Sequence, residues 1–442
     1  MHDWLDGQLA DSIAALDAGV SVNAEDRPHG AGEIGVLKTS AVSGGRFLSD
    51  QNKTVVERER RLVAESVQGD SILVSRMNTP ELVGESCYVR EPHPSLFLPD
   101  RLWQLKPKDR AKISMRWLSF VLQSAAYRRH VAVHATGTSG TMKNLPKAKL
   151  LGLPVRYPAP PEQSKIADVL DILDTAIHET QAIIAKLEAI ERGLLHDLLT
   201  RGIDVNGELR PPQAEAPRLY KPSPLGWIPK EWEEVTLGDI ARRSGGFLQT
   251  GPFGSQLHAH EYAIEGVPVV MPQDMVGGGL SAENIARVAE RRASALAKHR
   301  LRPNDIVFSR RGDLSRCVAI GDQHAGWLCG TGCLQARLPN VEVNGYWLAL
   351  IYRQPVTQAQ VMGRAVGSTM ANLNTSILAA ISIGRPSVGE QEEIFRRMET
   401  ASARIRSEEQ AVNKLRLAKA GLADDLLTGR VRVTPLLTAA RK

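Results

Sequence analysis

Apolar residues recur at alternating spacings of four and three along two stretches of the chain. In the first stretch they are Ile166, Leu170, Leu173, Ile177, Ile184, Leu187, Leu194 and Leu198, with Thr180 and Glu191 as polar interruptions. In the second they are Ile394, Met398, Ile405, Val412, Leu415, Leu422 and Leu426, with Ala401, Glu408 and Lys419 completing the alternation. A mean spacing of about 3.5 residues is typical of a coiled-coil seam, so both stretches are predicted to be long helices.

The ends of both stretches carry helix signals. Pro160 suits a first helical turn, and Ser387 and Glu390 have the spacing of a capping box. Gly202 and Gly429 stand where helix C-terminal glycines are expected. Each helix would span about 39 residues, or roughly 58 Å.

Charge favours pairing of these helices with each other. Residues 162–200 hold 3 basic and 8 acidic side chains, whereas residues 390–428 hold 7 and 8. The polar interruptions make either seam a poor homodimer interface, so we expect one antiparallel pair. The alternative is that each helix packs as an amphipathic element on its own domain.

The chain is also duplicated. Thr141-Met142-Lys143-Asn144-Leu145 recurs as Thr369-Met370-Ala371-Asn372-Leu373, 228 residues later. About 18 of the 60 positions from 141 to 200 are identical at this offset, and Trp4 falls on Trp232. In the middle of each repeat the offset rises to 234, where the Ile72 run meets the Ile306 run. Loops inside the repeats have therefore changed length, whereas the ends have kept register.

Upstream of each helix the pattern changes to short apolar runs bounded by turn residues, such as 71–75, 267–271 and 305–309, which predict short strands. Helices are expected around 115–127 and 346–353. The predicted fold class is mixed α/β, a tandem repeat of two globular domains, each followed by a long helix. The predicted boundaries are domain 1–157, helix 158–201, proline-rich linker 202–225, domain 226–385 and helix 386–430.

The net charge is informative about function only when it is counted separately for each region of the chain. The net charge of +6 over 442 residues is unremarkable, but residues 1–160 hold 21 bases and 17 acids, +4, and residues 218–385 hold 18 and 13, +5. Both globular domains are thus basic, as a nucleic-acid surface would require. No stretch suits a membrane span and the acidic start does not suit a signal peptide, so a cytoplasmic protein with reduced cysteines is expected.

The known catalytic motifs are missing from the sequence. It has no Walker A loop, H-E-x-x-H, G-x-S-x-G or G-x-G-x-x-G motif, and no Asn-Pro-Pro-aromatic tetrad. Cys317, His324, Cys329 and Cys333 could be compared with a zinc site, but their spacing does not fit one and only the second repeat has them. We expect no catalytic residue, resident metal or cofactor.

Several motifs resemble those of specificity (S) subunits of Type I restriction-modification systems. They are Gly226-Trp227-Ile228-Pro229-Lys230-Glu231-Trp232, Thr250-Gly251-Pro252-Phe253-Gly254-Ser255, the segments 158–163 and 386–391 that enter the helices, and the Leu-Leu-Thr that closes both. The first repeat lacks the first two motifs. The resemblance implies that each globular domain is a target-recognition domain for one half of a bipartite, asymmetric DNA site. It also implies that the antiparallel helices dock two modification (methyltransferase) subunits, and through them restriction subunits.

In that family, S-adenosylmethionine, ATP and Mg²⁺ would be needed only on the partner subunits. Candidate DNA-binding residues here are polar side chains on short loops. They are Lys38, Thr39, Ser40, Arg76, Asn78 and Lys143 in the first repeat, and Gln249, Gln273, Asp274, Arg310, Arg311 and Arg364 in the second. Arg310 follows a predicted strand and aligns with Arg76 of the other repeat. Thr141, Asn144, Thr369 and Asn372 recur identically, so they are expected to brace structure.

Three alternatives stay open from the sequence. The chain could be the specificity subunit of a Type II system with a combined methylase-nuclease partner. It could be a coiled-coil scaffold that binds a protein partner without DNA. It could also be a nuclease or methylase with a degenerate site.

Overall fold

The computed structural model describes residues 4–137, 141–253, 256–365 and 372–439. The chain forms two compact units, and the division between them falls inside both long helices. The first unit combines Met1–Ile183 with Glu408–Lys442, and the second is Ile184–Ser407. Among the described residues, no helix is long and apolar enough to cross a membrane.

The described part of the first unit has fifteen strands and several short helices in addition to its share of the long helices. The strands are β1 (Leu5–Gln8), β2 (Ile13–Ala18), β3 (Ala24–Glu25), β4 (Gly35–Leu37), β5 (Val42–Ser43), β6 (Arg46–Phe47), β7 (Asn52–Val55), β8 (Ser66–Val67), β9 (Ser71–Ser75), β10 (Met77–Asn78), β11 (Ser86–Val89), β12 (His93–Phe97), β13 (Leu102–Pro107), β14 (Lys143–Asn144) and β15 (Pro154–Tyr157). The helices are α1 (Leu9–Ser12), α2 (Met115–Val121), α3 (Ala125–His134), α4 (Lys147–Leu151) and α12 (Thr434–Ala439).

The second unit is built from the same kinds of element. Its strands are β16 (Tyr220–Ser223), β17 (Gly226–Pro229), β18 (Glu233–Thr236), β19 (Phe247–Thr250), β20 (Tyr262–Ala263), β21 (Val267–Val270), β22 (Met275–Val276), β23 (Gly279–Leu280), β24 (Ala286–Val288), β25 (Ile306–Ser309), β26 (Cys317–Ala319), β27 (Leu328–Cys329), β28 (Cys333–Arg337) and β29 (Ser382–Arg385). Its helices are α6 (Leu237–Ser244), α7 (Glu290–Ala295), α8 (Gly345–Tyr352), α9 (Pro355–Ala365) and α10 (Thr375–Ala379).

The two units share one sheet topology, which confirms the predicted tandem α/β repeat. The first unit has a four-stranded sheet in the order β11-β9-β13-β2, and the second has its counterpart, β26-β25-β28-β19. A second sheet contains β3-β7-β4-β12 in one unit and β20-β24-β21-β27 in the other. In both, one pair is parallel: β4 with β12, and β21 with β27. The first unit adds β8 to this sheet, and the second adds the β16-β17 hairpin elsewhere.

The duplication extends to backbone conformation. Asp70 and Asn304 precede the equivalent strands β9 and β25 and have φ values of 50° and 72°. They are the only non-glycine residues with positive φ among those the structure describes. Short polar side chains tolerate this conformation better than most, so the same tight entry into the strand is built with different residues.

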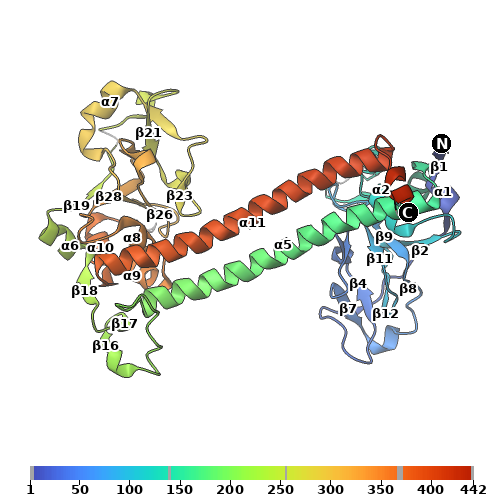
Figure 1. Cartoon of the computed structure of the whole chain (residues 1–442), viewed down its shortest axis with the longest axis horizontal. Helices are drawn as coiled ribbons and strands as arrows, with labels where there is room; N and C mark the ends of the chain where they lie inside the picture. Colours follow the sequence, from blue (N-terminus) through green and yellow to red (C-terminus); the bar gives the residue numbers. More distant parts are fainter. Residues whose placement is uncertain (1–3, 138–140, 254–255, 366–371, 440–442) are drawn as a thin grey trace. The chain divides into compact units, whose positions relative to one another are not determined.

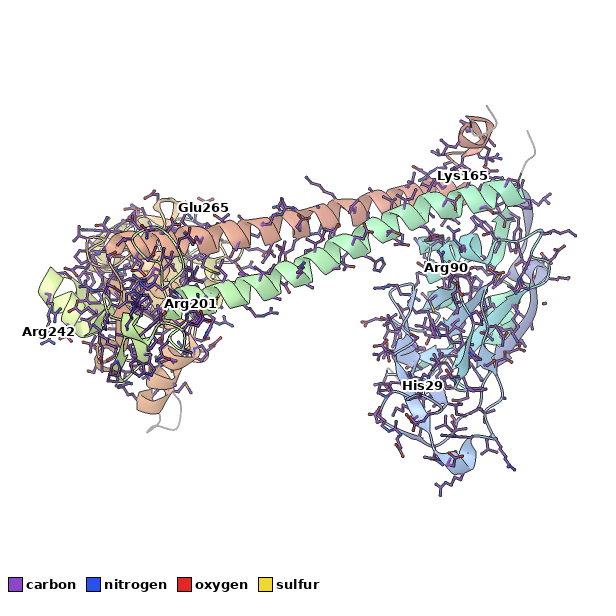
Figure 2. The ribbon with its side chains drawn as sticks, turned by 60° about the horizontal axis from the view of Figure 1, so that its bottom comes forward. His29, Arg90, Lys165, Arg201, Arg242 and Glu265 are labelled. Carbon is purple, nitrogen blue, oxygen red and sulfur yellow. The ribbon has the colours of Figure 1, made fainter. Side chains whose placement is uncertain are left out.

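The two long helices are α5 (Pro160–Thr200) and α11 (Val388–Thr428), and they lie side by side (Figure 1). Lys165 lies near the start of α5, and Arg201 lies just beyond its end (Figure 2). The last turns are closed by Gly202 and Gly429, with φ values of 64° and 76°. The pairing is antiparallel within each unit, because the start of one helix contacts the end of the other.

Every position of the predicted seam is buried or half-buried. Ile166, Leu170, Ile177, Leu198, Ile394, Met398, Ile405, Val412 and Leu426 are buried, whereas Leu173, Ile184, Leu187, Leu194, Leu415 and Leu422 are half-buried. Between them lie mostly exposed residues, including Ile172, Ile183, Ile190 and Leu417. The heptad positions therefore face the interior of the helix pair and of each unit's core.

Two polar interruptions of the seam, Lys419 and Glu191, have partners on the opposite helix, whereas Thr180 donates to a backbone carbonyl of its own helix. Lys419 Nζ lies 2.5 Å from Asp174 Oδ1 in the first unit. Glu191 accepts a hydrogen bond from the Ser402 hydroxyl in the second unit. Such contacts satisfy groups that would otherwise be buried without partners, and they specify which residues of the two helices meet.

The start of each long helix is fastened by the same three residue types. In the first unit Arg432 donates two hydrogen bonds to Glu162, at 2.6 and 2.8 Å, and the Trp4 indole donates a third at 3.3 Å. This group of residues will be called the first clamp. Arg432 comes from the segment after α11, so both ends of the described chain contribute to it.

The second clamp repeats this arrangement. Arg210 donates to Glu390 at 2.6 and 3.3 Å, and Trp232 donates to it at 3.1 Å. Arg210 comes from the segment after α5. A Cβ atom on Gly202 would lie 2.2 Å from the Glu390 carboxylate, so glycine is needed there for space as well as for backbone conformation.

Two local expectations differ from the structure. Residues 115–127 form two helices, α2 and α3, because Ser124 caps a new helix by accepting a hydrogen bond from the Tyr127 amide. Residues 202–225, predicted from their prolines to be a linker, contain buried Ile203 and Tyr220, which pack within the second unit. Proline content alone does not reveal burial.

Candidate nucleic-acid interface

Arg76 and Arg310 occupy equivalent positions at the ends of β9 and β25. Their backbone amides donate to the carbonyls of Arg101 and Gly332, both at 2.9 Å. Their backbone carbonyls accept from the amides of Leu145 and of its equivalent, Leu373. These bonds fix the backbone of each arginine in the same setting.

The side chains of the two arginines are also held alike. Arg76 Nε donates to Asn144 Oδ1 at 3.3 Å, and Arg310 Nε donates to Asn372 Oδ1 at 3.2 Å. The two recurring asparagines, expected to brace the structure, thus orient an arginine in each unit. Thr369 of the same repeated motif lies outside the described residues, and Thr141 lies in a turn.

An aromatic ring lies beneath each guanidinium. The guanidinium carbon of Arg76 is 5.5 Å from the centre of the Trp103 ring, and that of Arg310 is 5.0 Å from the Phe253 ring. Cation-π contact stabilises both positions. The rings come from different parts of the two units, since Trp103 is on β13 and Phe253 follows β19.

The other candidates of the first unit fall in two places. Asn78 and Lys143 face each other across the β10-β14 pair, beside Arg76. Lys143 Nζ donates to the Gly137 carbonyl at 2.8 Å. Elsewhere, Thr39 and Ser40 lie on a short 3₁₀ turn after Lys38, whose ammonium lowers the pKa of Asp26 through a hydrogen bond and its charge.

In the second unit, two candidates point inward. Gln249 donates to the Lys298 carbonyl at 2.7 Å and to the Gln335 side chain at 2.9 Å. Asp274 is buried, accepts from the Met271 amide at 2.8 Å, and has a pKa raised by that burial. These contacts favour structural roles for both side chains.

The remaining candidates are exposed. Gln273 lies on the same 3₁₀ turn as Asp274, Arg311 follows Arg310, and Arg364 lies in the last turn of α9. Arg311 forms no ion pair with any described residue. It therefore adds an uncompensated positive charge beside Arg310.

The cysteines are all buried. Burial raises the pKa of the Cys317 thiol to about 12 and also raises those of Cys87, Cys329 and Cys333. Thiols of high pKa are poor metal ligands and nucleophiles. Within the described ranges, no group of three or more His, Cys, Asp or Glu side chains has an arrangement suited to a metal ion.

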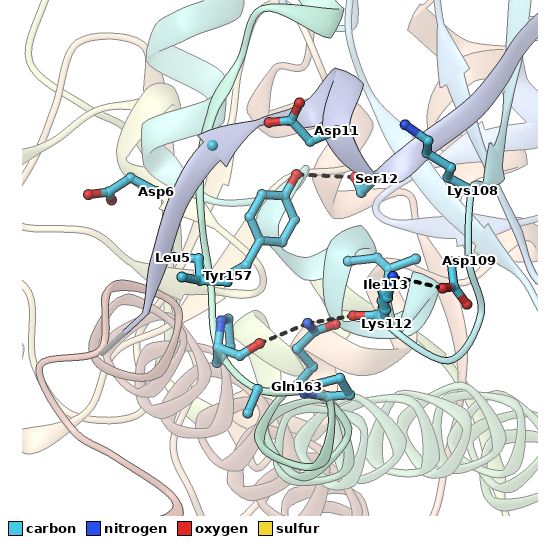
Figure 3. Close-up of a pocket in the computed structure, with 14 residues that line it drawn as sticks. Leu5, Asp6, Asp11, Ser12, Lys108, Asp109, Lys112, Ile113, Tyr157 and Gln163 are labelled. Carbon is cyan, nitrogen blue, oxygen red and sulfur yellow. Dashed lines mark hydrogen bonds and ion pairs between the residues drawn. The ribbon is translucent and has the colours of Figure 1, made fainter. Parts of the chain in front are cut away.

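A cavity of about 840 Å³ in the first unit lies away from the arginines (Figure 3). Its polar lining is already used for structure: the Tyr157 hydroxyl donates to the Gln8 carbonyl at 2.8 Å, and Gln163 donates to two carbonyls. At the equivalent place in the second unit, Arg385 forms ion pairs with Glu233 and Glu342. The cavity therefore marks a packing difference between the repeats.

The sequence does not reveal what holds the two arginines. It indicates Arg76 and Arg310 as candidates but not the rings beneath them or their bonds to asparagine. The recurrence of Asn144 and Asn372 was the available signal, because an identical polar residue in two diverged repeats requires a shared partner. The arginines of the two clamps carry no such signal, because Arg210 and Arg432 are not separated by the 228 residues that relate the two repeats.

The family model for the Type I restriction modification DNA specificity domain matches the chain twice, over residues 3–189 and 229–417. The first match covers β1 to β15 and runs into α5, and the second covers β18 to β29 and runs into α11. Together the matches cover well over half of the chain.

Curated relatives are specificity subunits. The putative type I restriction enzyme MjaX specificity subunit of Methanocaldococcus jannaschii is 22% identical over 442 residues, covering 98% of this chain and 94% of the relative. The MjaVIII specificity subunit of the same organism is 22% identical over 292 residues, covering 64% and 63%. The EcoEI specificity subunit of Escherichia coli is 25% identical over 202 residues, covering 45% of this chain and 33% of the relative. The chain thus spans less than two thirds of the latter two.

Solved structures share the fold. The S subunit of a Type-I restriction-modification system from M. genitalium has a TM-score of 0.57 at 16% identity, covering 96% of both chains. A chain from work on complex assembly and conformational transition of the type I R-M system has a TM-score of 0.53 at 14% identity, covering 97% of this chain and 98% of that one.

Proposed function

The chain belongs to the family of Type I restriction modification DNA specificity domains, and from this premise we propose that it is the DNA-specificity subunit of a Type I restriction-modification complex. It binds double-stranded DNA at a bipartite site and carries no catalytic step itself. The observation that carries the proposal is the double match to a DNA specificity domain on two units of one topology.

The two recognition domains, 1–157 and 226–385, read different half-sites. Their sheets have the same strand order, but their loops differ in length and sequence. Base edges are read by side chains that differ between the domains, so the target is asymmetric. Each domain is basic, which supports phosphate contacts and salt-dependent affinity.

The helix segments 158–201 and 386–430 dock two modification (methyltransferase) subunits, and restriction subunits join through that complex. Apolar side chains on the outer faces of the helices support this role: Ile172 is 68% exposed, Ile190 53% and Leu417 75%. Exposed apolar residues on a long helix pair suit a protein partner. S-adenosylmethionine, ATP and Mg²⁺ are used by the partners, and the complex acts in the cytoplasm.

Sequencing of methylated bases tests the proposal. The genome of a host with the chain and its modification partner is compared with that of the same host after deletion of the chain. We expect methylation of one asymmetric bipartite motif to disappear and to return when the chain is restored. If every methylated motif persists after deletion, the proposed function is wrong.

A further inference from the structure

The strongest further feature is the shared setting of Arg76 and Arg310. Each guanidinium uses its Nε to bond an asparagine that recurs in both repeats, and each lies over an aromatic ring. The two units differ in loop length and in most surface residues around this point. We therefore expect the two arginines to contact a chemical group that is present in the ligands of both units.

Among the residues that the structure describes, the terminal nitrogens of both guanidinium groups have no partner. Neither Arg76 nor Arg310 forms an ion pair with a described residue, and no hydrogen bond from their Nη1 or Nη2 atoms is found among those residues. Both side chains are half-buried, so part of each remains open to solvent. An arginine held at Nε presents its two terminal nitrogens as a rigid fork, which matches a phosphate or carboxylate in two parallel hydrogen bonds.

Building on the proposed function, we propose that Arg76 and Arg310 each bind a backbone phosphate of the DNA duplex, one in each half-site. A phosphate is present at every step of both half-sites, so one geometry serves two units that read different bases. The charges nearby agree with this. Lys143 lies beside Arg76 and Arg311 beside Arg310, and neither has a carboxylate partner among the described residues.

Asn144 and Asn372 are positioning residues in this proposal, because they act on DNA only through the arginines. They reduce the freedom that each arginine side chain loses on binding. The rings of Trp103 and Phe253 do the same from the other side of the guanidinium.

The test measures DNA binding by the complex of the chain with its modification subunits. Affinities for a duplex with the target motif and for an unrelated duplex are determined between 50 and 200 mM NaCl, for Arg76→Ala, Arg310→Ala and the double variant. Each single change should weaken binding to both duplexes by the same factor, about tenfold, and lower the salt slope by about one. Arg61→Ala and Arg291→Ala remove exposed arginines of the same two units that form no ion pair with a described residue, and they should change neither quantity.

Two further variants keep the proposal testable if the alanine variants do not fold. Arg310→Lys keeps the charge but lacks the fork, so it should lose about threefold in affinity with the salt slope unchanged. Asn372→Ala should behave in the same way, since only positioning is lost. Loss of affinity for the target duplex alone would mean that the arginines read bases, and would overturn the proposal.

Two other results would also overturn it: unchanged binding in both alanine variants, or loss of the modification subunits on purification, which would mean that the arginines face a protein partner. Failure of the proposed function can be distinguished from failure of this proposal. In that case the complex with the natural sequence would itself not prefer the target duplex.

Discussion

Asp305 in the second unit is a buried carboxylate held by several donors. Arg337 donates to it from Nε at 2.8 Å and from Nη2 at 2.7 Å, and Gln335 donates at 2.7 Å. The substitution Arg337→Ala would leave this charge buried and unpaired, so we expect a loss of about 3 to 5 kcal/mol in the free energy of unfolding. Urea denaturation followed by circular dichroism measures it.

The matched control is Arg242→Ala. Arg242 pairs with Asp239 on the surface, and its side chain is 79% exposed. Its loss should cost less than about 1 kcal/mol. Similar losses in the two variants would contradict the assigned role of Arg337.

His299 predicts a pH dependence of stability. It is 2% exposed, neither ring nitrogen has a described hydrogen-bond partner, and burial lowers its pKa to about 4. The unfolded chain binds this proton near pH 6.5, whereas the folded chain binds it only near pH 4. Between these pH values the unfolded state holds more protons than the folded state. The contribution of neutral His299 to stability is therefore complete above pH 6.5 and is lost as the pH falls to about 4.

The variant His299→Leu removes this titration. Free energies of unfolding measured from pH 7.5 to 4.5 should fall less steeply for the variant than for the natural chain. Parallel curves would show that His299 is protonated alike in both states.

At the scale of residues, the sequence predicted which arginines follow the strands but not what holds them. Arg76 and Asn144 are 68 residues apart, and only the folded β10-β14 pairing brings them together. Gln249 and Asp274 are candidates in the sequence because their side chains are polar. The contact of Gln249 with Gln335 depends on the pairing of β19 with β28, which no local pattern reveals. Asp274 instead accepts a hydrogen bond from a backbone amide within its own short turn, and its polar character does not reveal that this turn is buried.

At the scale of elements, the helix pair offers a matched comparison within one turn. Leu415 is a half-buried seam residue, whereas Leu417, two residues later, is 75% exposed. We expect Leu415→Asp to lower the melting temperature and to weaken co-purification with the modification subunit, because a charge would enter the seam. Leu417→Asp should leave the melting temperature nearly unchanged; the same decrease in both would argue against the seam.

The two long helices were predictable because a period of about 3.5 residues repeated over five heptads is a strong local signal. The sheets were not. Their strands are two to six residues long, and many of them pair with strands far away in sequence, as β2 does with β13. Short apolar runs therefore predicted individual strands such as β9 and β25, but the strand order depends on non-local contacts.

At the scale of the whole molecule, the first unit is discontinuous in sequence. Its core includes Leu426 and Val433, and its clamp joins Arg432 to Glu162 and Trp4. The variant Arg432→Ala should therefore destabilise the N-terminal part of the chain, although the substitution is near the other end. Amide hydrogen exchange should become faster in β1 and in the first turns of α5, and remain unchanged around Trp232.

Arg430→Ala is the control, because Arg430 pairs with Asp424 and Asp425 on the surface and its side chain is 61% exposed. It should leave exchange in β1 unchanged. Faster exchange in the second unit instead of the first would contradict the division of the chain into these two units.

The first clamp also sets the order in which the molecule can be completed. A ribosome makes residues 4–183 early, but Arg432 is added only after the whole second unit, at a rate of about 5 to 20 residues per second. For some tens of seconds the nascent first unit has Glu162 in place without its arginine. In the second clamp Glu390 follows Arg210 by 180 residues, so its last member is made before Arg432 and this clamp can close first. A chain released between residues 407 and 432 would thus have all residues of the second clamp but not the arginine of the first, so such truncated translation products would lack one finished half.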